Sequence, residues 1–183
     1  AVLQENARFA FRLFMDEIHM TGYNSCGATA QNTANSITGA SGSWELNGTG
    51  IQGYEHEDGI VSFPAQIRTD VTPESDVLVI RRGENPGYLV SNHTATSSTF
   101  KLHTNHAVDA GDIVLVATPD CAQLGYFQAV TAADNYLTHA AGNLVSPGNC
   151  TGNLAGTFSC GNGAGSQRPY TPGSLLMKLA SHA

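Results

Sequence analysis

The chain has 183 residues, a length that suits one domain with a sizeable core, and we expect a single domain over 1–183. Charged residues make up 13% of the chain, the net charge is −7, and Lys101 and Lys178 are the only lysines. A chain with this negative net charge and so few lysines has no stripe of basic residues that could bind the phosphates of a nucleic acid, so we expect no nucleic-acid partner. The sequence has no apolar run of about 18 residues, so it predicts no membrane span.

The first predicted element is an amphipathic helix at 1–21. Its apolar residues repeat at 3.6-residue spacing on two neighbouring stripes. The stripes are Leu3, Ala7, Ala10, Phe14 and Ile18, and Val2, Phe9, Leu13 and Met20, with Phe11 and Met15 further round. Gly22 suits the left-handed position that ends a helix. Since 1–3 offers no capping residue, we expect the natural helix to begin upstream of Ala1.

The rest of the chain predicts a polar connection followed by strands. Region 22–55 is too long for a plain connector and should carry local structure of its own. The β-sheet region, 56–183, contains a Gly-rich loop at 146–173 with two cysteines. Alternating or continuous apolar residues predict the strands 75–83, 87–92, 98–104, 111–118, 124–131, 135–141 and 173–179, with a further candidate at 59–67. One helix followed by antiparallel strands predicts an α+β fold in which the helix packs on the sheet.

No catalytic constellation stands out. Ser41 in "GASGS" misses the nucleophile pattern of a hydrolase, because a serine, Ser43, stands where the second glycine should be. We interpret Ser41 as a turn residue. No pair of carboxylates is placed for acid/base work, so we predict no enzyme, no catalytic residue and no cofactor.

Two groups of side chains raise the question of a metal. His93, His103 and His106 could form a three-histidine site if adjacent strands aligned, although solvated hairpin histidines are commoner. The acidic turn Glu55–Asp58 could hold calcium, but it lacks the spaced ladder of a calcium loop. We therefore predict no metal site and leave both groups as alternatives.

The four cysteines predict two disulfides. Cys26, Cys121, Cys150 and Cys160 show no CxxC spacing, which argues against zinc and thioredoxin-type chemistry. Disulfides indicate an oxidising compartment such as the periplasm or the cell surface.

Four ordered segments resemble one family. "ENARFAFRLFMDEIHMTGYNSCG" is similar to the segment that marks the PilW family of type IV minor pilins, with Glu5, Arg8, Phe9, Met20 and Cys26 among the matches. "SDVLVIRRG", "AGDIVLVATPDCAQLGYFQAV" and "THAAGNLVSPGNC" resemble later segments of the family in the same order. The resemblance covers nearly the whole chain. It implies a type IV pilin-like fold: a long N-terminal helix on an antiparallel sheet, with long loops held by disulfides.

The resemblance also implies a function. Members of the family are non-enzymatic subunits that act near the pilus tip to initiate assembly, in motility and adhesion. It implies partners among other minor pilins and the major pilin, with a tip adhesin as a further candidate. The expected location is the surface pilus, after a precursor stage in which a segment preceding Ala1 anchors the chain in the bacterial inner membrane with this domain in the periplasm. PilW proteins are similar to the J pseudopilins of type II secretion, which remain an alternative. An extracellular jelly-roll binding module, with Tyr54, Tyr88 and Trp44 as a sugar platform, is the other.

Two site predictions complete the expectations. Four cysteines allow three connectivities, and Cys150 and Cys160 flank one Gly-rich loop, so we expect them to pair and leave Cys26 with Cys121. One sheet can cover only one side of the helix, so some apolar residues should face partner subunits. We assign Val2, Phe11 and Met15 to that assembly face, since they lie furthest from the stripe through Ala10 and Phe14.

Overall fold

The computed structural model groups the chain into two compact units. Unit 1 comprises Ala1–Tyr23, Gly48–Arg82 and Ala180–Ala183, and unit 2 comprises Asn24–Asn47 and Gly83–Leu179. The residues that the structure describes are 2–27, 30–39, 50–56, 63, 67–84, 86–142 and 146–182.

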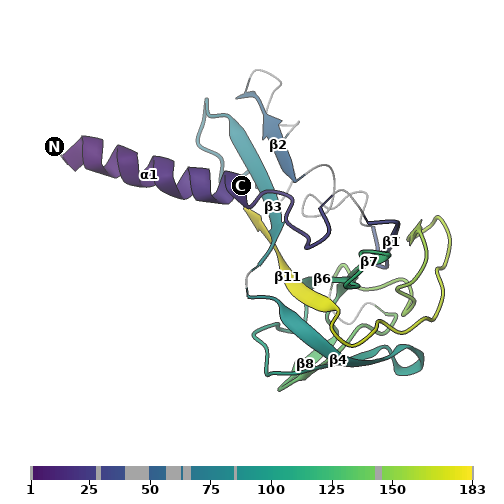
Figure 1. The fold of residues 1–183 in the computed structure, drawn as a ribbon. Helices are drawn as coiled ribbons and strands as arrows, with labels where there is room; N and C mark the ends of the chain where they lie inside the picture. Colours follow the sequence, from purple (N-terminus) through teal and green to yellow (C-terminus); the bar gives the residue numbers. More distant parts are fainter. Residues whose placement is uncertain are drawn as a thin grey trace. The chain divides into compact units, whose positions relative to one another are not determined.

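Unit 1 contains the helix and a hairpin-like pair of strands. The predicted helix is present as α1, Val2–His19, drawn in purple in Figure 1. Strand β2, Ile51–Tyr54, pairs antiparallel with β3, Val77–Gly83, with Ile51 opposite Ile80. The strand predicted at 75–83 is thus confirmed, and β2 is part of the local structure expected within the connection 22–55.

The end of α1 is held by close backbone contacts to this strand pair. Gly22 has a φ of 72°, as its predicted role requires, and its N–H donates to the carbonyl of Arg81 at 2.8 Å. A Cβ placed on Gly50 would lie 2.6 Å from the Cα of Gly22, so only glycine fits there. Since Arg81 N–H also donates to Gly50 at 2.7 Å, the helix terminus, β2 and β3 meet at one tight point.

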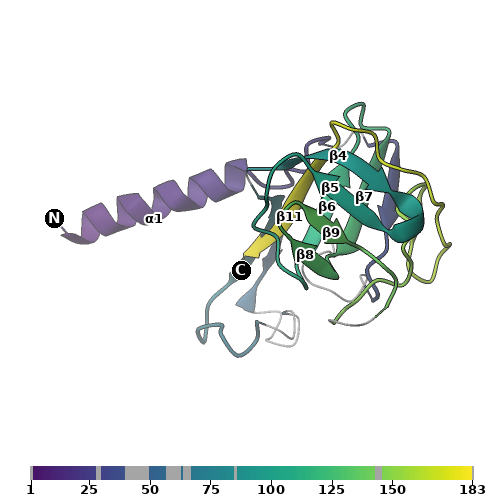
Figure 2. The same ribbon diagram turned by 90° about the horizontal axis from the view of Figure 1, so that it is seen from below.

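Unit 2 is built mainly of strands. Figure 2 shows its strands gathered together, and the hydrogen-bonded order places β11 between β6 and β4. The chain order is β1 (Asn32–Asn35), β4 (Tyr88–Thr94), the short 3-10 helix η4 (Ala95–Ser97), β5 (Thr99–Leu102), β6 (Ile113–Ala117), β7 (Gln123–Gln128), β8 (Thr131–Ala133), β9 (Tyr136–Thr138), β10 (Phe158–Ser159) and β11 (Leu175–His182), whose last residues belong to unit 1.

The strands of the described residues form one mixed sheet of eleven strands. The hydrogen-bonded order is β10-β1-β7-β6-β11-β4-β5-β9-β8, while β3 pairs with β2 and β11. Most neighbours are antiparallel, but β1 runs parallel to both β7 and β10, with Ala34 opposite Gly125 and Phe158. This strand, parallel to both of its neighbours, has no counterpart in the antiparallel plan expected from the sequence.

Strand β6 separates two buried clusters. Val114 and Val116 belong to a cluster with Phe100 and Phe127, whereas Leu115 contributes to a second cluster that contains Cys26, Ala117, Leu124 and Met177. Successive side chains of a strand point to opposite faces, so β6 is covered on both. This explains why its sequence is a continuous apolar run rather than an alternation.

The predicted architecture is therefore wrong. The helix does not pack on an antiparallel sheet: the protein is mainly a large mixed sheet with one short N-terminal helix and two disulfides. Neither buried cluster includes a residue of α1, because strand and loop side chains fill both clusters among themselves. The pilin-like fold implied by the resemblance is corrected accordingly.

The Gly-rich loop 146–173 is tied to the sheet as well as cross-linked. Cys150 is bonded to Cys160, as expected, and β10 within the loop pairs with β1. Leu154, Phe158 and Tyr170 are buried, so the loop adds apolar side chains to the interior.

Candidate functional site

The most distinctive surface of the chain is the apolar surface of α1. No residue of the helix is buried, and every side chain from Val2 to Asp16 is exposed. Phe11 is 70% exposed and Met15 48%, the fractions expected of surface lysines rather than of core residues. We call the exposed large apolar residues of α1 the helix patch: Val2, Leu3, Phe9, Phe11, Leu13, Phe14 and Met15.

The helix patch surrounds much of the helix. Successive residues turn by about 100°, so Val2, Phe9 and Leu13 share one side, and Leu3 and Phe14 lie on another. Phe11 and Met15 extend that second side further round. A helix that is apolar over so much of its circumference is typically buried on several sides. The predicted assembly residues Val2, Phe11 and Met15 are all exposed, but they are only part of a larger patch.

The helix is attached to its own unit at its C-terminal end. The Arg82 guanidinium donates through Nε and one Nη to the two carboxylate oxygens of Glu17, at 2.8 and 3.0 Å. A two-bonded arginine–carboxylate pair fixes orientation as well as distance. Ile18 and Met20, on either side of His19, are half-buried, whereas the preceding turns are exposed. The attachment therefore leaves the helix patch accessible.

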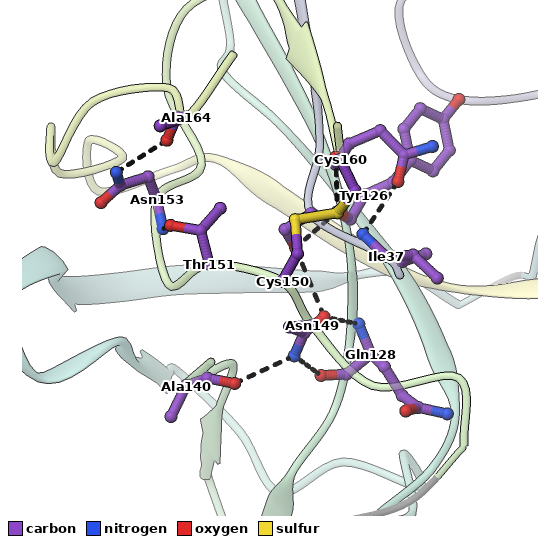
Figure 3. Close-up of a disulfide and its surroundings, with 12 residues drawn as sticks. Ile37, Tyr126, Gln128, Ala140, Asn149, Cys150, Thr151, Asn153, Cys160 and Ala164 are labelled. Carbon is purple, nitrogen blue, oxygen red and sulfur yellow. Dashed lines mark hydrogen bonds between the residues drawn. A yellow bond between two sulfur atoms is a disulfide. The ribbon is translucent and has the colours of Figure 1, made fainter. Parts of the chain in front are cut away.

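Both disulfides have the expected partners. Cys26 is bonded to Cys121 and Cys150 to Cys160, across 95 and 10 residues. Figure 3 shows the second bond beside Asn149, whose amide group donates to and accepts from the main chain of Gln128 at 2.7 Å. Asn149 is buried, so these bonds fix the start of the Gly-rich loop against β7.

The structure does not bring the three candidate metal histidines together. His93 is buried, His103 is exposed, and His106 uses one ring nitrogen on the Tyr136 carbonyl and the other on the Val108 N–H. Within the described ranges no three metal-binding side chains are grouped. Of the acidic turn Glu55–Asp58, Glu57 and Asp58 lie outside the described residues.

The other sequence candidates are placed as follows. Ser41 and Trp44 lie outside the described residues. Tyr54 packs edge-on against Phe63, and Tyr88 packs edge-on against His106 while its hydroxyl accepts the Ala107 N–H. Both tyrosine rings thus contact neighbours in their own unit.

One buried polar pair was not anticipated. His93 meets His139 with 2.9 Å between their Nε2 atoms. In β9 the buried Leu137 stands two residues before His139, so strand alternation was the signal that could have placed His139 inside. For His93 no such signal existed, because a register shift between Val90 and Asn92 breaks the alternation of β4.

Comparison with protein-family models, with curated proteins and with solved structures found no match in any of the three. Among the described residues, no helix combines the length and the apolar character needed to cross a membrane. The helix patch and the sequence of α1 are therefore the features of this chain that point to a function.

Proposed function

We propose that this chain is a non-enzymatic minor pilin of a type IV pilus, joined to other pilin subunits through the helix patch. The observation that carries the proposal is a helix with seven large apolar side chains exposed to water in the isolated chain. Contiguous exposed apolar surface of this kind marks interaction sites. The residues of α1 are also those in which the resemblance to minor pilins is densest.

The proposal depends on the helix and not on the architecture first expected. A helix packed on a sheet would have offered only a narrow remaining stripe to partners. With α1 uncovered, its apolar sides are available to the helices of other minor pilins and of the major pilin. The proposed location is the surface pilus, where initiation of assembly requires subunits to associate with one another.

The energetics favour several partner helices over one. Burial of about 300 Å² of apolar surface supplies about 7 kcal/mol at 25 cal/mol per Å². Association of two proteins costs about 4–15 kcal/mol in lost freedom and ordering. One helix contact of this size therefore binds weakly, whereas contacts on two or more sides of α1 stabilise an assembly.

The test replaces two residues of the helix patch in the full-length protein. Phe11→Ser with Met15→Ser removes two exposed apolar side chains of the predicted assembly face, and we expect loss of surface pili, of twitching and of co-purification with the other minor pilins. Leu89→Ser is the matched control, because Leu89 is 51% exposed but lies on β4. The control should leave assembly intact.

Two results would count against the proposal. Normal pili with the double substitution would refute the assembly face. Loss of secretion with normal pili would assign the same helix to a type II secretion pseudopilin. In both cases the double variant must unfold as cooperatively as the unaltered chain, so that a folding defect is not mistaken for an assembly defect.

A further inference from the structure

The buried histidine pair lies in the interior of unit 2. His93 is on β4 and His139 follows β9, and their side chains are 5% and 0% exposed. The His93 ring stacks on Phe100 with 3.9 Å between centroids, and the His139 ring lies 5.1 Å from both Phe100 and Phe127. The pair is therefore enclosed by aromatic side chains.

The hydrogen bonds fix where the protons sit. The main-chain N–H of Tyr170 donates to Nδ1 of His93 at 3.0 Å. A backbone N–H can only donate, so this Nδ1 carries a lone pair and the proton of neutral His93 is on Nε2. That Nε2–H donates to Nε2 of His139, so the proton of neutral His139 is on Nδ1. This Nδ1 is buried and has no hydrogen-bond partner within the described part of the chain.

Neither histidine can bind an additional proton in this arrangement without placing two hydrogen-bond donors opposite each other. On His93 it would face the Tyr170 N–H, and on His139 it would face the Nε2–H of His93, so two donors would point at each other. Burial lowers the pKa of His93 to about 4 and, together with the neighbouring His93, that of His139 to about 3. Of the side chains that pack against the pair, Phe100 and Phe127 do not titrate. Tyr170 does, and burial raises its pKa further, so it supplies no counter-charge.

Tyr170 anchors an otherwise exposed segment. Residues 161–169 and 171–173 are exposed, and Tyr170 between them is 2% exposed. Its ring lies 5.6 Å from that of His93, and its hydroxyl donates to the Leu154 carbonyl at 2.9 Å. The hydrogen bond to His93 is thus one of the contacts that hold this segment on the sheet.

We propose that His93, His139 and Tyr170 form a proton-sensitive latch: uptake of a proton by the histidine pair breaks the bond to the Tyr170 N–H and releases segment 167–173 from the sheet. The released state exposes at least one histidine to water, where its pKa is about 6.5. The latched state stays neutral, so release becomes about tenfold more favourable for each pH unit below 6.5 and for each histidine exposed. The latch is independent of the helix patch and of its proposed function.

Amide hydrogen exchange on the whole chain tests the latch directly. We expect the protection of the Tyr170 amide, corrected for the intrinsic exchange rate, to fall about 50-fold from pH 6.5 to pH 4.5 if one histidine is exposed, because that histidine is already half protonated at pH 6.5. Amides of β6, such as Leu115, exchange only when the core opens, so they should stay more strongly protected than Tyr170 at every pH of this range. Unchanged protection at Tyr170, or protection at Tyr170 equal to that at Leu115 at every pH, would overturn the proposal.

A double variant separates the latch from general acid sensitivity. In His93→Asn with His139→Phe, the asparagine oxygen can accept the Tyr170 N–H, and neither position titrates. We expect Tyr170 protection to become independent of pH, whereas the exposed-site control His103→Asn should retain the full dependence. A dependence on pH that survives in the double variant would contradict the latch.

If that variant does not fold, ¹⁵N spectra of the unaltered histidines decide. The latch requires His93 to carry its proton on Nε2 and His139 on Nδ1 at neutral pH, and the opposite tautomers would refute it.

Discussion

Strand β6 and helix α1 are both rich in apolar residues, but only β6 is buried. Every residue of β6 after Ile113 is buried, with both faces of the strand covered. In α1 no residue is buried, and Phe9, Phe11 and Leu13 are each more than half exposed. The comparison separates two uses of apolar side chains: those of β6 stabilise the folded chain, while those of α1 are available to other molecules.

Removal of the long disulfide should produce the largest difference between the two regions. Cys26→Ala with Cys121→Ala opens a link between two residues of unit 2 that are 95 positions apart in the chain. The chain-entropy relation gives a loss of about 4.7 kcal/mol for a loop near this length. Denaturant unfolding followed by near-ultraviolet circular dichroism should report this loss for the sheet. The loop between Cys150 and Cys160 spans 10 residues, and opening it should cost less, about 2.7 kcal/mol. Equal losses for both bonds would contradict the entropic explanation.

Truncation of one phenylalanine in each region tests the comparison most directly. Phe127 is 0% exposed, so Phe127→Ala should lower the free energy of unfolding by about 3–5 kcal/mol. Phe11 is 70% exposed, and Phe11→Ala should change it by less than about 0.5 kcal/mol. Urea unfolding of the two variants measures both values. A large loss for Phe11→Ala would mean that α1 contributes to the stability of the isolated chain.

Acid should weaken unit 2 through the buried histidines. Both have folded-state pKa values, about 4 for His93 and about 3 for His139, below the value of about 6.5 for an unfolded chain. The unfolded state therefore binds more protons below pH 6.5, and stability present above that pH is lost as the pH falls. Each histidine should contribute a loss that approaches about 1.4 kcal/mol per pH unit and amounts to about 2 kcal/mol between pH 6.5 and 4.5.

Denaturant unfolding at a series of pH values measures this loss. His139→Phe should reduce the slope by the share of one histidine, while Phe11→Ala should leave it unchanged. A slope in the unaltered chain no steeper than in His139→Phe would show that His139 does not remain neutral in the fold.

The smallest effect is expected where α1 meets its own unit. The Glu17 side chain is 37% exposed and that of Arg82 17%, so solvent weakens their attraction. Glu17→Gln should cost less than about 1 kcal/mol. The helical signal of the last turn of α1 should melt at a lower temperature, as measured by far-ultraviolet circular dichroism. Asp16→Asn, one residue earlier on the exposed surface, should leave that melting unchanged, and an equal shift would mean that the ion pair does not hold the helix end.

Local patterns predicted most elements but not their arrangement. The alternation in 75–83 and the apolar run in 111–118 became β3 and β6, and Gly22 ended the helix as expected. Strand β1 has the polar sequence "NTAN" and gave no such signal, because its place is set by pairing with β7 and β10, far away in the chain. The pattern of α1 identified an apolar surface, but the local sequence does not indicate which segment or molecule covers that surface. The sequence predicted both disulfide pairs because loop length limited the choices.

The candidate histidine site also did not form, and hydrophobic periodicity could not have predicted the reason, which is a register shift in β4. The shift in β4 places Val90 and His93 inside although three positions separate them. A regular strand would have placed Asn92 on the face of Val90. The alternative of a shared site from His93, His103 and His106, which the sequence left open, required adjacent strands to align.

The position of β1 between β7 and β10 constrains the order in which the chain can fold. Asn32 to Asn35 must wait for partners near residues 123–126 and 158–159. In a chain made from its N-terminus, the residues of α1 and β1 are synthesised long before these partners exist, and contacts so distant in sequence form slowly. The apolar side chains of α1 are therefore exposed during synthesis as well as in the finished fold. A factor that protects nascent chains would therefore meet exposed apolar side chains on α1 before β1 acquires its partners, and β1 itself stays unpaired on one edge until β10 has been made.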